Sequence, residues 1–242
     1  MDKDTIKIGV PFKGMIGHRG CAGLETENTL KAFNEGGSRS YIGLECDVHP
    51  TLDGFIVVNH DETLERVVGN KAIINKMNFS ELREIPFPDK SNNNEINPLI
   101  RLPLLEEYLD VCIKYNKIPV VELKQTLKSK DINKVLEIVN SKHLMDKVIF
   151  ISFFPGYLTK IRRKLPNVQI QFLSQKWSEG VFNLCTHFNF GIDLEHTECT
   201  KEVIDKMHSK GLKVNVYTVD DKDEALRLIS YGIDFITSNI LE

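Results

Sequence analysis

The sequence contains no long apolar run. No stretch among its 242 residues approaches the ~20 consecutive apolar residues that a membrane-spanning helix requires. The N-terminus also lacks a basic start followed by about 7 to 15 apolar residues, which is the pattern of a secretory signal peptide. We therefore expect a cytoplasmic protein without stable membrane anchoring.

Cysteine pairs and excess positive charge are also missing. The five cysteines are an odd number without a Cys-x-x-Cys pair, which argues against a disulfide framework and against a cysteine zinc site. The 31 basic residues are balanced by 34 acidic ones, so the formal net charge is -3. Because the basic excess that neutralises a phosphate backbone is absent, we expect no nucleic-acid partner.

What the sequence does contain is a repeated alternation of two patterns. Short runs rich in β-branched residues, typical of buried strands, alternate with amphipathic segments whose ends carry helix-capping residues. The predicted strands are residues 14–18, 41–48, 118–124, 147–153, 168–174, 190–196, 213–219 and 233–238. The predicted helices are residues 27–37, 104–116, 129–143, 155–165, 200–211 and 220–232. Residues 175–189 are weakly patterned, but the alternation predicts a helix there too.

Eight strands in this alternation predict an α/β protein with the (β/α)8 TIM-barrel fold, built as one domain over residues 1–242. One interval departs from the repeat, because an insertion at about residues 55–103 separates the second strand from the next helix. The run FIVV at 55–58 predicts a short extra strand. The Asn-rich tract at 88–98 predicts a mobile surface excursion near the carboxyl ends of the strands.

Candidate functional residues follow from the fold, since TIM barrels place their active sites at the carboxyl ends of the strands. The groups expected there are His18 and Arg19 from the first strand, Glu45 and Asp47 from the second, Glu122 and Lys124 from the third, Tyr217 from the seventh, and His60 and Asp61 from the loop after the second. Carboxylates, imidazoles and basic groups are thus predicted to converge from separated parts of the chain.

The three carboxylates predict a metal site. Glu45 and Asp47 are two residues apart on a strand, so both side chains face the same side, and Glu122 ends the neighbouring strand. Like charges so close together raise one another's pKa unless a cation neutralises them. An all-oxygen set suits Mg²⁺ or Ca²⁺, so we expect one divalent cation. The alternative is a structural ion network with Arg19 and Lys124.

The motifs also resemble those of a known family. The segments HRGCAGLETENTLKAF at 18–33, ECDVHPTLDGFIVVNHDETLER at 45–66, LPLLEEYL at 102–109, VELK at 121–124, and VNVYTV and GIDFITSN near the C-terminus are similar, in this order, to the glycerophosphodiester phosphodiesterase family. The resemblance implies a TIM-barrel enzyme that hydrolyses glycerophosphodiesters to glycerol 3-phosphate and an alcohol with a bound divalent cation. It also implies that the insertion covers the site.

The resemblance implies a role for each candidate residue. It places the catalytic pair on His18 and His60, the metal ligands on Glu45, Asp47 and Glu122, and the phosphate contacts on Arg19 and Lys124. Two histidines suit this reaction because one can take a proton from the attacking hydroxyl while the other protonates the departing alkoxide. Taken singly, however, either could be a surface or a hydrogen-bonded buried histidine.

Some positions depart from the family pattern. Thr26 replaces a common Pro, Tyr217 stands where the family often has Trp against the substrate's glycerol, and ITSN at 236–239 replaces a Pro-containing turn. These changes affect the expected substrate preference and leave the catalytic set intact. Asp193 and Glu195 either reach the mouth to bind a polar head group or form an ion pair at the rim.

Two other functions remain open from the sequence. A related barrel could act on intact phospholipids, like phospholipase D-like toxins or phosphoinositide phospholipase C, although the missing signal peptide and missing exposed apolar stretch disfavour it. A non-catalytic phosphodiester-binding barrel is disfavoured because it has no need for both histidines.

Overall fold

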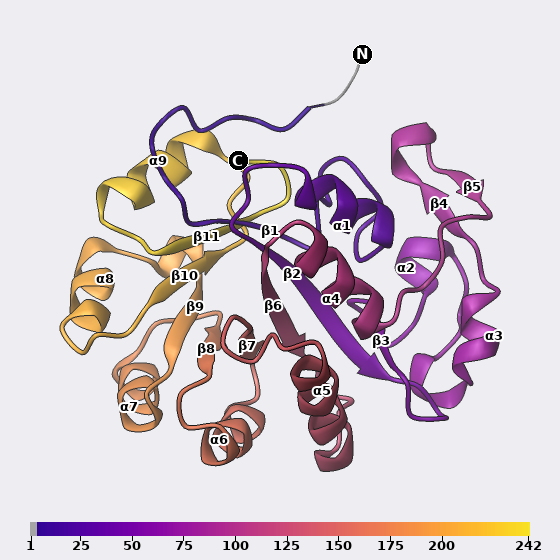
Figure 1. Ribbon diagram of the computed structural model, residues 1–242. Helices are drawn as coiled ribbons and strands as arrows, with labels where there is room; N and C mark the ends of the chain where they lie inside the picture. The colour runs from indigo at the N-terminus through magenta and orange to yellow at the C-terminus, as the bar shows by residue number, and fades with distance from the viewer. Residues whose placement is uncertain (1–3) are drawn as a thin grey trace.

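Eight parallel strands close into a barrel in the computed structural model, which describes residues 4–242 (Figure 1). Closure comes from β1, which pairs in parallel with both β2 and β11. The barrel strands are β1 (Met15–Gly17), β2 (Gly43–Pro50), β6 (Ile118–Leu123), β7 (Ile149–Ser152), β8 (Gln169–Ser174), β9 (Gly191–Glu195), β10 (Val214–Tyr217) and β11 (Phe235–Ser238). All eight predicted strands are confirmed.

Helices surround the barrel as predicted (Figure 1). They are α1 (Leu30–Gly37), α4 (Leu105–Lys114), α5 (Ser129–Ser141), α6 (Pro155–Lys164), α7 (Glu179–Phe188), α8 (Lys201–His208) and α9 (Lys222–Ser230). The weakly patterned segment forms α7, and its ends explain why: the Ser178 side chain accepts a hydrogen bond from the Val181 amide, and Asn189 ends the helix in the left-handed conformation.

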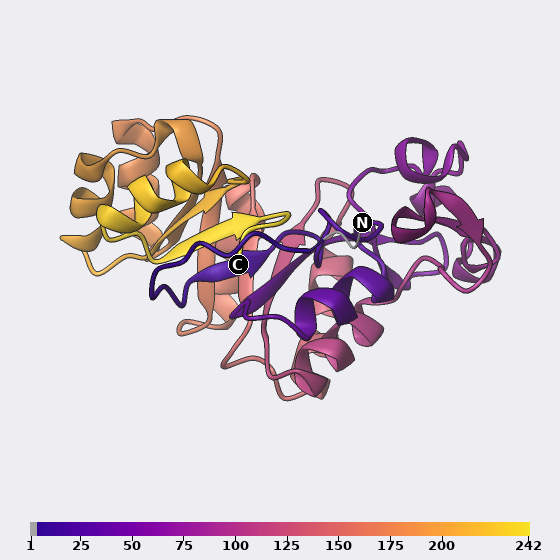
Figure 2. The ribbon, with the colours of Figure 1, turned by 90° about the horizontal axis from the view of Figure 1, so that it is seen from above.

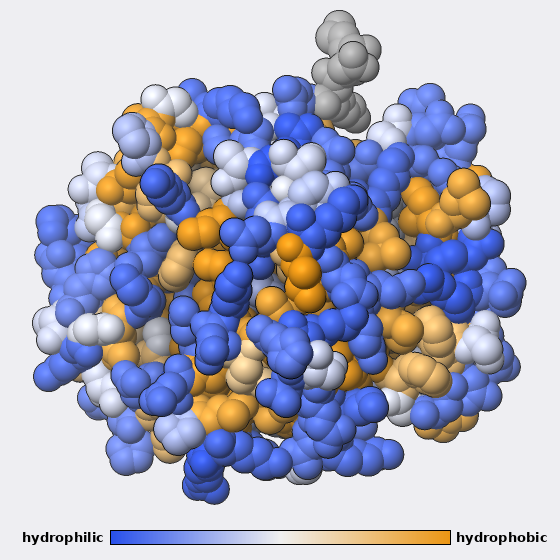
Figure 3. Space-filling model, viewed as in Figure 1, coloured by the Kyte–Doolittle hydropathy of each residue, from blue (hydrophilic) through white to orange (hydrophobic). Residues whose placement is uncertain are grey.

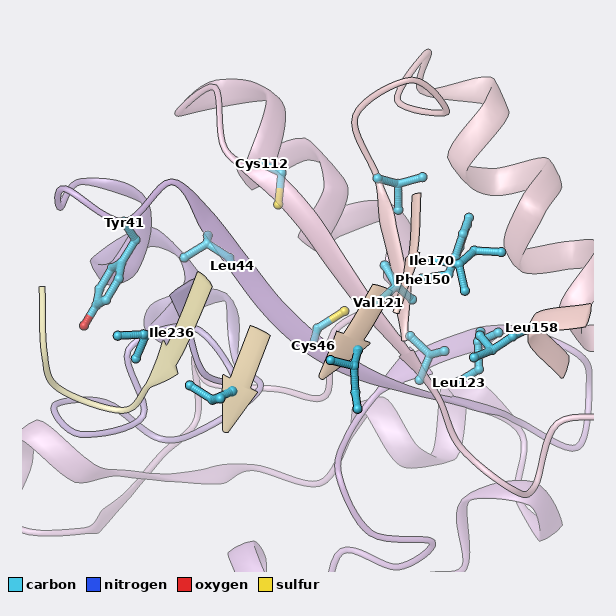
Figure 4. Close-up of a cluster of buried hydrophobic side chains, with 14 of the residues drawn as sticks. Tyr41, Leu44, Cys46, Cys112, Val121, Leu123, Phe150, Leu158, Ile170 and Ile236 are labelled. Atoms are coloured by element: carbon cyan, nitrogen blue, oxygen red, sulfur yellow. The ribbon is translucent and has the colours of Figure 1, made fainter. Parts of the chain in front are cut away.

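Two apolar layers hold the barrel together. The larger one lies between strands and helices, and Figure 4 shows part of it, including Cys46 of β2, Val121 of β6 and Phe150 of β7. A smaller cluster fills the barrel interior and includes Ile16, Val120, Ile149, Ile151 and Leu173. Strand alternation explains the division, because successive residues point to opposite faces. Towards the carboxyl ends the inward positions become polar, which places the candidate site there.

The insertion packs beside the barrel (Figures 1 and 2). It contains β3 (Ile56–Val58), α2 (Glu65–Val68), α3 (Phe79–Arg83), β4 (Phe87–Asp89) and β5 (Glu95–Asn97), with single 3-10 turns at Ile74–Lys76 and Lys90–Asn92. The predicted extra strand is confirmed as β3, which pairs antiparallel with the end of β2. The insertion buries a small core of its own that includes Leu64, Ile74, Leu82, Phe87 and Leu102.

The Asn-rich tract, predicted to be a mobile surface excursion, contains β4 and β5, which pair antiparallel as a hairpin. The hairpin is also fastened to the barrel. Lys31 of α1 forms an ion pair with Asp89 at 2.6 Å, and the Thr26 hydroxyl donates to the Pro88 carbonyl at 2.6 Å and accepts from the Lys90 amide at 3.1 Å. The sequence pattern missed this because the fastening residues lie more than fifty positions away.

Polar side chains cover much of the face in Figure 3, with apolar residues in patches among them. Within residues 4–242, none of the helices combines the length and the apolarity needed to cross a bilayer.

Thr26→Val should loosen the hairpin, because it removes both hydrogen bonds of the hydroxyl and leaves a carbonyl and an amide unpaired. We expect amide exchange in residues 87–97 to become about fivefold faster, which corresponds to about 1 kcal/mol of local opening free energy. Hydrogen-exchange mass spectrometry measures this. Thr159→Val is the matched control, since its hydroxyl bonds only within α6. Unchanged exchange in the hairpin of Thr26→Val would show that the hydroxyl does not hold it.

Candidate active site

Strands β2 and β6 bring three carboxylates together. One oxygen each of Glu45, Asp47 and Glu122 lies within 4.8 Å of the others. The strand register explains this, because Asp47 is paired with Glu122 and Glu45 is the next inward position on β2. The three side chains are well buried, with residue exposures of 3%, 1% and 9%. The convergence predicted from the sequence is therefore present.

Two basic side chains compensate only part of the negative charge of these carboxylates. Lys124 bridges Asp47 at 2.9 Å and Glu122 at 2.8 Å, and the Arg19 Nε lies 3.5 Å from Asp47. Burial alone would raise the pKa of Asp47, but Lys124 and Arg19 outweigh it and hold that pKa below its usual range. Asp47 is thus ionised.

The other two carboxyl groups have less positive charge beside them, because Lys124 is shared between Asp47 and Glu122. Burial, followed by the charges of Asp47 and Glu122, raises the pKa of Glu45 well above its ordinary value. Burial, followed by the charge of Asp47, raises the pKa of Glu122 to about 7. Within residues 4–242 no Lys or Arg side chain forms an ion pair with Glu45, whose closest basic side chain is His18 at 3.9 Å.

The donor set fits a divalent cation. The ion network expected as the alternative does exist around Asp47, but it leaves a surplus of buried carboxyl groups that a cation would neutralise. Three carboxylate oxygens without sulfur or imidazole suit Mg²⁺ or Ca²⁺. Glu45, Asp47 and Glu122 would hold such an ion.

His18 lies at the end of β1 beside this cluster. Its Nδ1 lies 2.8 Å from the Asn239 Oδ1, and the Asn239 amide donates to Asp220 at 2.7 Å. This fixes the amide so that its oxygen accepts from Nδ1, and the His18 Nε2 is then the acceptor nitrogen. Burial, followed by the neighbouring Arg19, lowers the pKa of His18 to about 4, so the imidazole is neutral near pH 7.

His60 is oriented by a chain of ion pairs. Its Nδ1 lies 2.7 Å from the Asp61 carboxylate, which is bound in turn by Arg66 at 2.6 Å. Arg66 also binds Glu27 at 2.7 Å, and Glu27 binds Arg19 at 2.8 Å. Burial lowers the pKa of His60 below its ordinary value, against the opposing charge of Asp47. The contact with Asp61 therefore orients the His60 ring.

Several supporting residues were missed by the sequence reasoning. His49 reaches the His60 carbonyl with its Nε2 at 3.0 Å, while its Nδ1 lies 2.7 Å from the Thr126 hydroxyl. Asn28 donates to Asp47 at 2.8 Å. The signals were available in part, because Asn28 lies in the ENT motif and Asn239 in ITSN. Their partners lie far away in the sequence, so only the fold identifies them.

These side chains share one pocket, a cavity of about 340 Å³. Its lining includes His18, Arg19, Glu45, His60, Glu122, Lys124 and Tyr217. Of the described residues that line it, only His60 comes from the insertion, so the insertion borders the pocket and the expectation that it covers the site is not met. The Tyr217 hydroxyl donates to the Ser174 carbonyl at 3.2 Å, which leaves its ring as the part that faces a ligand.

Comparison with known proteins connects this pocket to an activity. The sequence pattern of the glycerophosphoryl diester phosphodiesterase family matches residues 18–241. The chain belongs to this family. Membership confirms the family resemblance and the enzyme class predicted from the sequence, a phosphoric diester hydrolase.

Individual relatives agree along nearly the whole length. The Bacillus subtilis protein YqiK is 29% identical over 228 residues, covering 91% of this chain and 92% of its own. The glycerophosphodiester phosphodiesterase of Bacillus altitudinis is 26% identical over 229 residues, covering 92% of this chain and 92% of its own. Among solved structures, an Oleispira antarctica phosphodiesterase in complex with the product sn-glycerol-3-phosphate has a TM-score of 0.85 at 23% identity, covering 97% of this chain and 96% of its own. The glycerophosphodiester phosphodiesterase from Thermotoga maritima has a TM-score of 0.77 at 24% identity, covering 95% of this chain and 95% of its own. These structures confirm the fold.

Metal binding should stabilise the protein in a pH-dependent way. The folded pKa of Glu122, about 7, exceeds its ordinary value of 4.5, so protonation stabilises the metal-free protein at low pH and this contribution is lost as the pH rises through about 7. A cation replaces the proton. At 100 times the dissociation constant the cation should raise the melting temperature by about 5 to 10 °C. At one fixed metal concentration the rise should be larger at about pH 8 than at about pH 6, because fewer protons then compete with the cation.

Differential scanning fluorimetry with Mg²⁺ or Ca²⁺ measures this shift. Glu45→Gln should abolish it, whereas the control Glu195→Gln should retain it, because the Glu195 carboxylate is at the barrel rim and accepts from the Thr197 amide. An equal shift in Glu45→Gln would mean that the ion binds elsewhere.

Proposed function

We propose that the protein hydrolyses glycerophosphodiesters to glycerol 3-phosphate and an alcohol, with one divalent cation and with His18 and His60 as the proton-transfer groups. The proposal is carried by one observation: a single pocket is lined by both imidazoles, two basic side chains and two of the three clustered carboxylates. The relative from Oleispira antarctica, described with sn-glycerol-3-phosphate as its product, supports the same substrate class.

Arg19 and Lys124 are suited to bind the phosphate. A phosphodiester is an anion that repels nucleophiles, so a catalyst must neutralise its non-bridging oxygens. Arg19 and Lys124 both line the pocket, so their positive charges lie where the phosphate would enter. The backbone amide of Arg19 donates to Glu45 at 2.9 Å, and this bond fixes the residue beside the carboxylates.

The cation would supply Lewis-acid polarisation of a phosphoryl oxygen when bound between Glu45, Asp47 and Glu122. Asn28 and Lys124 keep Asp47 in place through hydrogen bonds of 2.8 and 2.9 Å. Their contacts fix the carboxylate before substrate arrives, and preorganisation of this kind lowers the cost of reaching the transition state.

The two imidazoles are suited to move protons. The Nδ1 of His18 is held by Asn239 and that of His60 by Asp61, so in each ring Nε2 is left for the substrate. Both pKa values are lowered by burial, so both rings are neutral before substrate binds. An anionic phosphodiester raises the pKa of an adjacent imidazole, which lets one ring carry the proton that the departing alkoxide needs while the other accepts one.

A substrate panel tests the activity. Glycerophosphocholine, glycerophosphoethanolamine, glycerophosphoglycerol and glycerophosphoinositol are each incubated with protein that has been treated with a chelator and then supplied with Mg²⁺ or Ca²⁺. We expect glycerol 3-phosphate from at least one of them, only when a metal is restored. If no member of the panel yields glycerol 3-phosphate with either metal, the proposed function is wrong.

His18→Ala and His60→Ala should each lower kcat by about 10²- to 10⁴-fold, because each removes a proton-transfer group. Steady-state kinetics on the best substrate of the panel measures this. His187→Ala is the matched control, since His187 lies on α7 and does not line the pocket. A variant of His18 or His60 with nearly unchanged kcat would remove that residue from the mechanism.

A further inference from the structure

One side of the pocket has no part in binding the phosphate or the cation. Its wall is formed by Ile151 and Phe153 from the end of β7, Leu173 of β8 and Tyr217 of β10. The rings of Phe153 and Tyr217 meet edge to face, with centroids 6.0 Å apart. The carboxylic acid that lies among these side chains is Asp193 on β9, and the other polar residues lining this part of the pocket, Gln175, Thr218 and Thr237, are uncharged.

Asp193 is buried and incompletely bonded. The residue is 1% exposed, and its Oδ1 has no hydrogen-bond partner among residues 4–242. More than about 90% of buried polar groups in proteins are bonded, and an unbonded one is costly to fold around. The residue lines the cavity, so a ligand held there lies beside a carboxyl group whose bonding the fold leaves incomplete.

The neighbouring polar groups supply at most one bond to this carboxyl group, from the Asn215 side chain, which opposes the effect of burial on the Asp193 pKa. Asn215, paired with Asp193 in the strand register, shares a hydrogen bond of 3.2 Å with the Thr237 hydroxyl and also accepts from the Val216 amide. The Tyr217 hydroxyl is bonded to the Ser174 carbonyl. Burial, followed by the charge of Glu122, raises the pKa of Asp193 well above its ordinary value, which favours the protonated form of the carboxyl group. A neutral carboxyl can both donate and accept.

We infer that Asp193 binds a hydroxyl group of the substrate's glycerol and is a specificity-determining residue of this pocket. The inference rests on the proposed function and extends it to one end of the substrate. A three-carbon polyol matches this side of the pocket, because its carbon chain packs on Tyr217 and Phe153 while a hydroxyl meets the Asp193 carboxyl group.

The chemistry favours glycerol over the departing alcohol. Glycerol is common to all glycerophosphodiesters, and a group that never varies suits a fixed position on a barrel strand, as Asp193 has on β9. A cationic head group such as choline would call for an ionised carboxylate, whereas burial favours the neutral form of this carboxyl. The uncharged partner that matches a donor and acceptor in one group is a hydroxyl.

Ligand pairs that differ only in hydroxyl groups test the inference without turnover. Calorimetry compares sn-glycerol 3-phosphate with n-propyl phosphate, which has the same carbon chain and no hydroxyl, at a fixed concentration of Mg²⁺ or Ca²⁺. We expect the wild-type protein to prefer glycerol 3-phosphate, and Asp193→Leu to reduce that preference roughly 5- to 10-fold. Asp193→Asn, which still donates and accepts, should retain most of it.

Stability separates this role from a structural one. Because the carboxyl is buried with an unbonded oxygen, Asp193→Leu should not lower the melting temperature. If leucine is not accommodated, Asp193→Ala gives the same ligand comparison. Glu195→Gln, on the same strand but outside the pocket lining, should leave the preference unchanged.

The outcomes distinguish this inference from the proposed function. If Asp193→Leu binds both phosphates as the wild-type protein does, or loses both equally and melts at a lower temperature, Asp193 does not recognise the hydroxyl, even if the wild-type protein hydrolyses glycerophosphodiesters. If the wild-type protein itself binds n-propyl phosphate as tightly as glycerol 3-phosphate, the inference is also overturned. If it binds neither ligand and hydrolyses no glycerophosphodiester, the proposed function and the inference both fail.

Discussion

Mutual repulsion among three buried carboxylates is the interaction on which the rest of this site depends. Glu45, Asp47 and Glu122 lie within a few ångströms of one another in a place where water cannot screen them. Lys124 and Arg19 lower the pKa of Asp47, while those of Glu45 and Glu122 remain raised. A folded protein that keeps such an arrangement stabilises it by protonation or by a cation, and the proposed hydrolysis uses the cation.

The segment from β2 into the insertion supplies both the carboxylates proposed as metal ligands and one of the histidines proposed to transfer protons. On β2, Glu45 and Asp47 face the pocket while Cys46 and Val48 pack into the outer apolar layer, so the alternation of one strand anchors the ligands. The chain then turns through β3 to reach His60, whose carbonyl contacts His49 at the end of β2. Asp53 holds this turn, accepting from the Thr51 hydroxyl and from the Phe79 amide.

The local sequence pattern was sufficient to predict the barrel and the residues at the carboxyl ends of its strands. Strands such as 118–124 are short apolar runs that contain β-branched residues, and two-residue spacing was enough to place Glu45 and Asp47 together. Contacts between distant segments could not be predicted in this way. The hairpin β4–β5 is held by Thr26, His18 by Asn239, and Glu27 meets Arg66 across the mouth. From the sequence, Asp193 could either bind a polar head group or form an ion pair at the rim. Only the folded structure reveals that the residue is buried and that its Oδ1 has no hydrogen-bond partner among residues 4–242.

The central claim is that the carboxylate cluster holds one divalent cation, and anomalous diffraction tests it most directly. Crystals grown with Mn²⁺, which replaces Mg²⁺ in oxygen sites and scatters anomalously, should show one strong peak within about 2.0 to 2.6 Å of oxygens from Glu45, Asp47 and Glu122. The absence of a peak there, with Lys124 still bridging Asp47 and Glu122, would contradict the account.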